Sequence, residues 1–345
     1  YGGVVIDCLC DGCFTLFFYS EALLVLISQP AGLAQLASHY LVIVGFAMAP
    51  ALIIQVLKSY LAAQELVTFA LVTTILGFFV NIPLNYILIF GEFGLPELGV
   101  EGSAIASVLV NSFMAICLCL YAARKLPEQA LFQQIWRPDW TSLRIVIRLG
   151  LPISVTSLAE AGLFSASTLM MGWLGTIAVA AHGIALNITS LTFVIHVGLS
   201  SAATIQVGQA FGAHRLEELK RGAIMAFLAS AIIVGATVVL FLSIPEFLVS
   251  LFVDPKAPEL DQILIYGTLF LLMSALFSTV DAAQVMALGI LRGIQDTSVP
   301  MVMAVVSYWL IGIPVAYWLA FPLGLEGVGL WAGLALGLAC AAIGL

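Results

Sequence analysis

Residues 220–244 read KRGAIMAFLASAIIVGATVVLFLSI, and no charged side chain occurs between residues 222 and 244. A helix needs about 20 apolar residues to cross the hydrocarbon core of a bilayer, and the strands of soluble proteins are much shorter. The stretch therefore predicts a transmembrane helix that starts beside two basic residues.

Similar apolar runs follow one another along the whole chain, with the Pro and Gly interruptions that transmembrane helices tolerate. They cover residues 3–28, 40–63, 67–90, 100–123, 145–172, 177–207, 262–290, 298–321 and 327–345. Together with 220–244 they predict an all-α polytopic membrane protein with about ten transmembrane helices. Because the run 177–207 is longer than one span, we expect its helix to tilt or to project from the membrane.

The low charge of the chain excludes several function classes. Of its 345 residues, 62% are hydrophobic and only 9% are charged, whereas a soluble domain carries about 25% charged residues. So few ionic groups cannot cover the surface of a water-soluble fold, which excludes a soluble enzyme, a nucleic-acid-binding protein and a disordered chain. The net charge of −8 also argues against a phosphate-binding surface.

The basic residues indicate the orientation of the chain in the membrane. If successive runs cross in alternating directions, all but one of the 11 Lys and Arg residues lie on the same side. The positive-inside rule makes that side cytoplasmic. Its basic residues are Lys58, Arg124, Lys125, Arg137, Arg144, Arg148, Arg215, Lys220, Arg221 and Arg292, and only Lys256 lies opposite.

One long polar connection, residues 124–144, divides the chain into a part with four runs and a part with six. We predict a first lobe over residues 1–123, a cytoplasmic linker over 124–144 and a second lobe over 145–345. Tyr1 and Leu345 both lie inside apolar runs, so we expect the sequence to be a piece of a longer chain.

The two parts contain similar segments in the same order. Residues 20–30 (SEALLVLISQP) parallel residues 245–255 (PEFLVSLFVDP), and residues 81–86 (NIPLNY) parallel residues 312–317 (GIPVAY). Internal repeats are typical of secondary transporters, whose substrate path lies between the repeats. If the repeat has six helices, the first lobe lacks its first two.

Acidic residues inside the spans are the first candidates for a functional site, because a charge at the bilayer centre costs at least about 2.5–3.5 kcal/mol. Glu160 and Asp281 lie deep in the fifth and eighth runs. Two carboxylates that face a common cavity can bind Na⁺ or exchange a proton. The alternative is that each only hydrogen-bonds a neighbouring helix, for which Ser or Asn would suffice. Asp7 and Asp11 share a helix face near the cytoplasmic end, and for them we favour simple hydration.

Two amides and a proline form a further candidate site in the third run. Asn81 and Asn85 are spaced by four residues around Pro83, which removes one backbone hydrogen bond. The freed carbonyl and the amide oxygens suit a cation, but the amides also suit hydrogen bonds between helices, and the sequence leaves both open. Aromatic residues of the ninth run, among them Tyr308 and Tyr317, suit either a cavity for cationic ligands or an interfacial belt.

The histidines and cysteines of the spans have simpler interpretations. We expect His182 and His196 to be structural residues with satisfied hydrogen bonds. Cys8, Cys10 and Cys13 form a C-x-C-x-x-C string, but a second ligand cluster is not visible, so we predict small apolar side chains and no metal site.

Several motifs together resemble the multidrug and toxic compound extrusion (MATE) family. They are VGQAFGA at 207–213, AAHGIALN at 180–187, LGLP at 149–152, LRGIQDT at 291–297, NIPLNY at 81–86 and SYWLIGIP at 307–314. The resemblance extends over essentially the whole chain and is closest to the NorM-like branch. It implies twelve helices in two six-helix lobes, of which this chain holds the third to the twelfth.

The resemblance also implies a function and a set of site residues. The family exports organic cations and drugs by alternating access, in exchange for H⁺ or Na⁺, and needs no other cofactor. Glu160 and Asp281 resemble the paired acids of its second-lobe cation site, and Asn81 and Asn85 match the amides of its first-lobe site. A tyrosine usually precedes the second acid by one turn, where this chain has a phenylalanine. Further residues expected to line the cavity are Asn187, Phe277, Tyr308 and Tyr317.

We therefore expect a monomeric transporter in the bacterial inner membrane that binds small amphipathic or cationic molecules and membrane lipid, and no nucleic acid. One alternative is a lipid-linked oligosaccharide flippase of the same superfamily, which should show more basic residues in its cavity. An intramembrane enzyme would need a catalytic dyad or metal ligands at depth, and neither is visible. A purely structural membrane bundle is disfavoured by the buried acids and the repeat.

Overall fold

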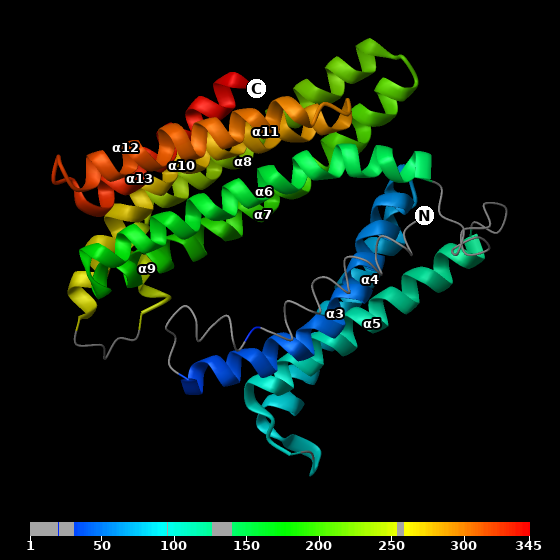
Figure 1. The fold of residues 1–345 in the computed structure, drawn as a ribbon, viewed down its shortest axis with the longest axis horizontal. Coiled ribbons are helices and arrows are strands. Elements are labelled where there is room, and N and C mark those ends of the chain that lie inside the picture. Colours follow the sequence, from blue (N-terminus) through cyan, green and yellow to red (C-terminus); the bar gives the residue numbers. More distant parts are fainter. Residues whose placement is uncertain (1–19, 21–30, 95, 126–139, 254–258) are drawn as a thin grey trace. The chain divides into compact units, whose positions relative to one another are not determined.

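The structure is a computed structural model that describes residues 20, 31–94, 96–125, 140–253 and 259–345 (Figure 1). The chain divides into two compact units, Tyr1–Arg144 and Ile145–Leu345. The described residues contain no strand and nine helices that are long and apolar enough to cross a membrane. This confirms the prediction of an all-α polytopic protein. Apart from Ser20, the first predicted run lies outside the described residues, as do Asp7, Asp11 and the three cysteines near them.

The first unit contains three long helices: α3 (Ala31–Ala63), α4 (Val67–Phe90) and α5 (Gly99–Lys125), with a short 3₁₀ turn, η1 (Glu92–Gly94), after α4. Helix α5 packs against both of the others. The core of the first unit is built from aliphatic side chains such as Leu61 and Leu118. The rings of Phe69 and Tyr121 stack with their centroids 3.8 Å apart.

The second unit contains the remaining helices, which run along a roughly common direction (Figure 1). They are α6 (Trp140–Leu174), α7 (Thr176–Gly212), α8 (Leu216–Ser243), α9 (Pro245–Ser250), α10 (Leu260–Gly293), α11 (Ser298–Val305), η3 (Val306–Gly312), α12 (Ile313–Ala320) and α13 (Glu326–Gly344). Segments α11, η3 and α12 form one continuous span, Ser298–Ala320. The middle segment, η3, is π-helical and ends just before Pro314, which cannot donate a backbone hydrogen bond.

Helix α10 is the centre of the second unit, because it packs against α7, α8, α9 and α13. Two side chains of α7 form hydrogen bonds with the backbone of α10. Ser200 Oγ donates to the Val285 carbonyl over 2.7 Å, and Thr204 Oγ1 donates to the Gly289 carbonyl over 2.8 Å. Hydrogen bonds between helices add to packing inside a membrane, where lipid supplies no hydrophobic force between them. The position of α10 relative to α7 is therefore well defined.

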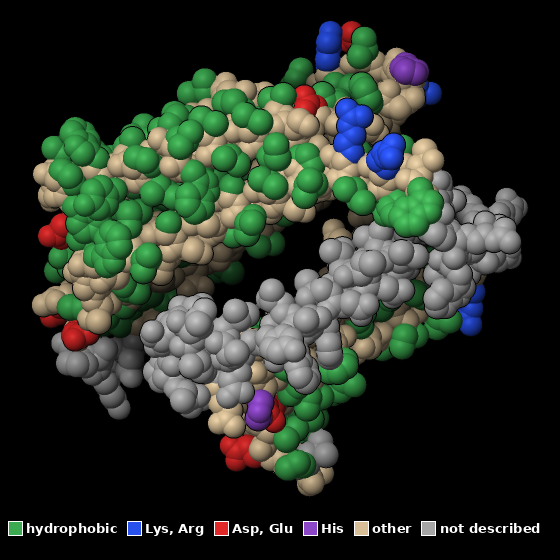
Figure 2. Space-filling view, viewed as in Figure 1, with side chains coloured by type: hydrophobic (Ala, Val, Ile, Leu, Met, Phe, Trp, Pro, Cys, Tyr) green, Lys and Arg blue, Asp and Glu red, His purple; other side chains and the backbone are tan. Residues whose placement is uncertain are grey.

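The outer surface of the second unit is apolar, which is the reverse of a soluble protein. Ile232, Leu158 and Leu310 are 69–74% exposed, and Figure 2 shows hydrophobic side chains covering the sides of the helices. The Lys and Arg side chains visible on this unit gather at the end that holds the turn between α7 and α8 (Figure 2). This separation of charge is the pattern from which the cytoplasmic side is predicted.

Candidate functional site

Asp281 is the most deeply buried acid of the described residues. It lies near the middle of the long helix α10, and only 5% of its surface is exposed. Within the described part of the chain its Oδ1 atom has no hydrogen-bond partner. Because buried polar atoms are nearly always hydrogen-bonded, an unpartnered carboxyl oxygen at this depth makes Asp281 a candidate ligand-binding residue.

Glu160 approaches this acid from a different helix. It lies on α6, is half-buried, and is close enough to Asp281 for the two carboxyl groups to interact electrostatically. Next to it, the Ala159 carbonyl accepts a hydrogen bond of 3.3 Å from Trp309 Nε1, which ties this part of α6 to η3. The structure therefore brings together the two acids that the sequence singles out.

Three further polar residues surround the acids. Tyr308, fully buried on η3, accepts a hydrogen bond from Gln284 Nε2, one turn after Asp281 on α10. The other amide atom, Gln284 Oε1, is buried without a partner among the described residues. Arg292 of the last turn of α10 is half-buried and interacts electrostatically with Glu160 and Tyr308. We call these residues the acidic cluster: Glu160, Asp281, Gln284, Arg292 and Tyr308.

Two members of the acidic cluster were not predicted from the sequence as site residues. Gln284 was not singled out, and Arg292 was assigned only to the cytoplasmic basic residues. The available signal was spacing, because positions 281, 284 and 292 lie three and eleven residues apart and share one face of a helix. The oxygen atoms of the acidic cluster suit a proton or a small hard cation. In the described residues, the acidic cluster included, no group of three or more His, Cys, Asp and Glu side chains is placed to hold a metal ion.

The other predicted lining residues of the second unit lie in different surroundings. Phe277 is 1% exposed and packs in the core edge-on to Phe164 and Trp331, with ring centroids 5.9 and 5.6 Å away. Asn187 is on the exposed face of α7, and its Nδ2 donates to the Gly183 carbonyl over 2.9 Å. Tyr317 is 48% exposed, on α12. Of these three, only Phe277 lies within one helical turn of the acidic cluster.

The predicted amides of the first unit lie on α4. Asn81 and Asn85 are both half-buried, and Asn85 Nδ2 donates to the Asn81 carbonyl over 3.0 Å. One amide of the pair is therefore hydrogen-bonded within its own helix.

Two buried histidines on α7 differ in their surroundings. His196 Nδ1 forms a hydrogen bond of 2.9 Å with Ser230 Oγ of α8. His182 is fully buried, but neither of its ring nitrogens has a partner in the described part of the structure. The expectation of a satisfied structural histidine thus holds for one nitrogen of His196 and not for His182.

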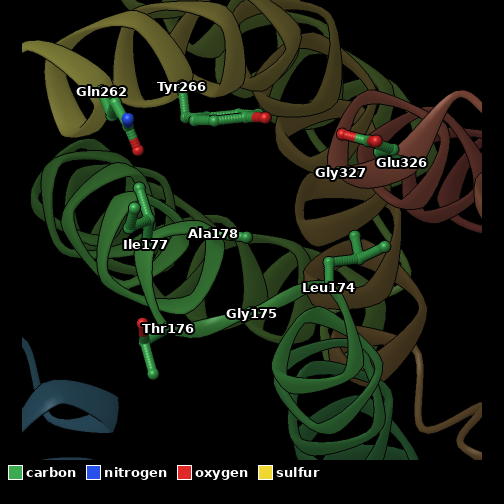
Figure 3. Close-up of a pocket in the computed structure, with 9 residues that line it drawn as sticks. All are labelled: Leu174, Gly175, Thr176, Ile177, Ala178, Gln262, Tyr266, Glu326 and Gly327. Atoms are coloured by element: carbon green, nitrogen blue, oxygen red, sulfur yellow. The ribbon is translucent and has the colours of Figure 1, made fainter.

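A pocket of about 230 Å³ opens at the end of the second unit where α6 passes into α7 and where α10 and α13 begin (Figure 3). Its polar lining comes from Thr176, Gln262, Tyr266 and Glu326. This end lies opposite to the basic turn between α7 and α8, which the positive-inside rule predicts to be cytoplasmic, and we call this pocket the outer pocket for that reason.

Comparison with known proteins relates the chain to one family. The MatE family model matches residues 5–87 and 152–318. The chain is 41% identical over 330 residues to a probable multidrug resistance protein NorM of Agrobacterium fabrum, which covers 95% of this chain and 71% of that protein. It is 39% identical over 327 residues to the protein of the same name from Rhizobium meliloti, covering 94% and 70%.

Solved structures show the same fold. A eukaryotic MATE transporter superposes with a TM-score of 0.81 at 22% identity, over 100% of this chain and 75% of that chain. A MATE protein in the straight conformation gives a TM-score of 0.85 at 20% identity, over 99% and 74%.

Proposed function

The chain belongs to the MATE family of membrane transporters, and on that premise we propose that it is a secondary active antiporter of the bacterial inner membrane. It exports organic cations and other amphipathic drugs in exchange for H⁺ or Na⁺. The family and its NorM-named relatives confirm the resemblance predicted from the motifs, and they confirm a transporter rather than an enzyme. The substrate class is supported by the relatives' common name, multidrug resistance protein.

The observation that carries this proposal is the acidic cluster. Asp281 is buried with an unpartnered oxygen and interacts with Glu160, a second acid on another helix. Holding a carboxylate at the bilayer centre costs at least about 2.5–3.5 kcal/mol, and a bound proton or cation removes much of that cost. The cluster therefore has a physical reason to bind the ion that drives transport.

Exchange of ion for drug requires that the two ligands favour different conformations of the transporter. Glu160 of α6 interacts electrostatically with both Asp281 and Arg292 of α10, so a movement of α6 relative to α10 changes the balance between these two partners. We propose that a bound ion holds Glu160 toward Asp281 and that its release lets Arg292 neutralise Glu160.

The remaining predicted residues keep their proposed roles. Asn81 and Asn85 serve a first-lobe site for a cation or for substrate, and Asn187 and Tyr317 contribute to the path of the drug. The protein acts as a monomer surrounded by lipid.

The test is drug uptake into everted membrane vesicles, whose cytoplasmic face points outward so that export fills the vesicle, with Na⁺ and pH gradients imposed separately. We expect Asp281→Asn and Glu160→Gln each to abolish ion-driven efflux of ethidium while the amount of inserted protein is unchanged. Asp261→Asn is the matched control, because Asp261 is an exposed acid in the first turn of the same helix α10. Full transport by both single variants would refute the proposal.

A further inference from the structure

His182 is a buried polar residue that the acidic cluster does not explain. None of its surface is exposed, and neither ring nitrogen accepts or donates a hydrogen bond within the described residues. Its ring lies edge-on to Trp331 of α13, with centroids 5.5 Å apart, and Trp331 Nε1 also lacks a partner there. The two ring nitrogens of His182 and the Nε1 atom of Trp331 thus lie in one part of an otherwise apolar core. Buried polar atoms without a hydrogen-bond partner are rare in proteins.

The outer pocket lies one helical turn from His182 and Trp331, toward the end of the second unit. Ala178 and Gly327 belong to its lining (Figure 3). His182 and Trp331 follow them by four residues on α7 and α13, which places each one turn deeper on the same helix face. The pocket also holds the carboxylate of Glu326 (Figure 3), so a cation or a proton donor has a favourable place at its mouth.

A row of polar atoms continues from these residues toward the acidic cluster. Trp331 contacts the ring of Phe277, one turn before Asp281 on α10. Ser274, Ser278 and Asp281 recur at intervals of four and three residues, and all three are buried on one face of α10. Ser278 Oγ and Asp281 Oδ1 have no partner among the described residues. Ser274 Oγ donates to the Leu271 carbonyl over 2.8 Å, so the unpartnered buried polar atoms between the pocket and the acid are those of His182, Trp331, Ser278 and Asp281.

From this arrangement we propose that His182 relays protons between the outer pocket and Asp281. The inference rests on the proposed antiport and deepens it, since it makes H⁺ the coupling ion. Water held by Trp331 Nε1–H and by the hydroxyl of Ser278 completes the path, because each of these groups can still form a hydrogen bond.

The chemistry of the relay is that of a neutral imidazole, which carries one N–H and one bare nitrogen. The bare nitrogen takes a proton from water in the pocket, and the other nitrogen releases its proton inward, where it ends on a carboxylate oxygen of Asp281. A flip of the ring restores the starting tautomer. The ionisable groups at the outer end of this path are Tyr266 and Glu326 of the pocket lining, and those at its inner end are Glu160, Asp281, Arg292 and Tyr308 of the acidic cluster. The same helices also carry His196 further along α7 and Asp261 in the first turn of α10.

His196 provides a matched control on the same helix. It is also buried, at 3% exposure, but it is hydrogen-bonded to Ser230 of α8 and lies fourteen residues beyond His182. His182 and His196 are therefore both buried histidines of α7. Only His182 lies beside the outer pocket and the unpartnered polar atoms that follow it.

The experiment uses the full-length protein in proteoliposomes, where ethidium transport driven by a pH gradient and equilibrium ethidium binding are both measured. We expect His182→Gln to slow pH-driven transport on the order of 100-fold, because an amide cannot pass a proton between two atoms. Ethidium binding should be unchanged. His182→Ala should show the same selective loss, and imidazole added on the outer side should restore transport. His196→Gln should keep both activities.

The outcomes separate this inference from the proposed function. If Asp281→Asn loses ion-driven transport while His182→Gln transports at the wild-type rate, the relay is wrong and the antiport stands. Wild-type transport by Asp281→Asn overturns the relay, and full transport by Glu160→Gln as well overturns the proposed function. Loss of ethidium binding in His182→Gln, or no restoration by imidazole in His182→Ala, indicates a structural role and overturns the relay. Ser278→Ala removes only a hydroxyl from the path, so it should slow pH-driven transport without affecting binding, and wild-type kinetics in this variant also contradict the relay.

Discussion

Helix α13 packs on α12 and η3 through glycines at four-residue intervals, and this contact yields a quantitative prediction. A Cβ atom at Gly333 would meet the backbone N and Cα of Ala316, and one at Gly337 would come within 2.8 Å of the Gly312 Cα. Backbone atoms cannot rotate away as side chains do, so the variant Gly333→Ala must push the two helices apart.

The size of the effect follows from two opposing terms. Alanine is favoured over glycine inside a helix by about 1 kcal/mol, whereas overpacking costs about 1–3 kcal/mol and more where backbone is met. We expect Gly333→Ala to lose about 2 kcal/mol of stability, which lowers the melting temperature of a unit of this size by about 4–8 °C.

The assay is thermal unfolding of the purified protein in detergent, followed by size-exclusion chromatography with fluorescence detection. Gly235→Ala on α8 is the matched control, because no atom lies within 4 Å of a Cβ added there. It should keep or raise the melting temperature. If the two variants melt within about 1 °C of each other, the packing described for α13 is wrong.

Two further predictions concern hydrogen bonds within the second unit. Gln284→Leu leaves the buried hydroxyl of Tyr308 without its donor and should cost about 1–3 kcal/mol, while the double variant with Tyr308→Phe should recover part of that loss in the same unfolding assay. Additive losses in this double-mutant cycle would contradict a direct interaction. Thr204→Val removes the bond to the Gly289 carbonyl and should cost about 0.6 kcal/mol, the average for such bonds in membranes; an unchanged melting temperature would show that this bond adds nothing to the contact between α7 and α10.

The helices could be predicted from the sequence because a membrane requires apolar runs of a fixed length. The run 67–90 coincides with α4 (Val67–Phe90), and the run 100–123 lies within α5 (Gly99–Lys125). The π-helical segment Val306–Gly312 was not predicted, because its composition is that of any transmembrane helix and its geometry depends on the neighbouring proline and on packing against α13.

The candidate site could be predicted only where a single residue carries the signal. Glu160 and Asp281 stand out because a buried acid is costly by itself. Gln284 and Arg292 share the face of α10 that carries Asp281, but the hydrogen bond from Gln284 to Tyr308 and the electrostatic interaction of Arg292 with Glu160 depend on where η3 and α6 lie, which the sequence does not display. The unpartnered state of His182 depends in the same way on Trp331, a residue 149 positions further along the chain.

The central claim is that an ion bound at Asp281 and Glu160 is linked to drug binding. The most direct measurement is the Kd for ethidium of the purified protein, determined as the concentrations of H⁺ and Na⁺ are varied separately. Linked ligands typically change each other's affinity about 5–150-fold, so we predict a Kd shift of that size for the wild type with one of the two ions and none for Asp281→Asn. An equal shift in wild type and Asp281→Asn would contradict the account.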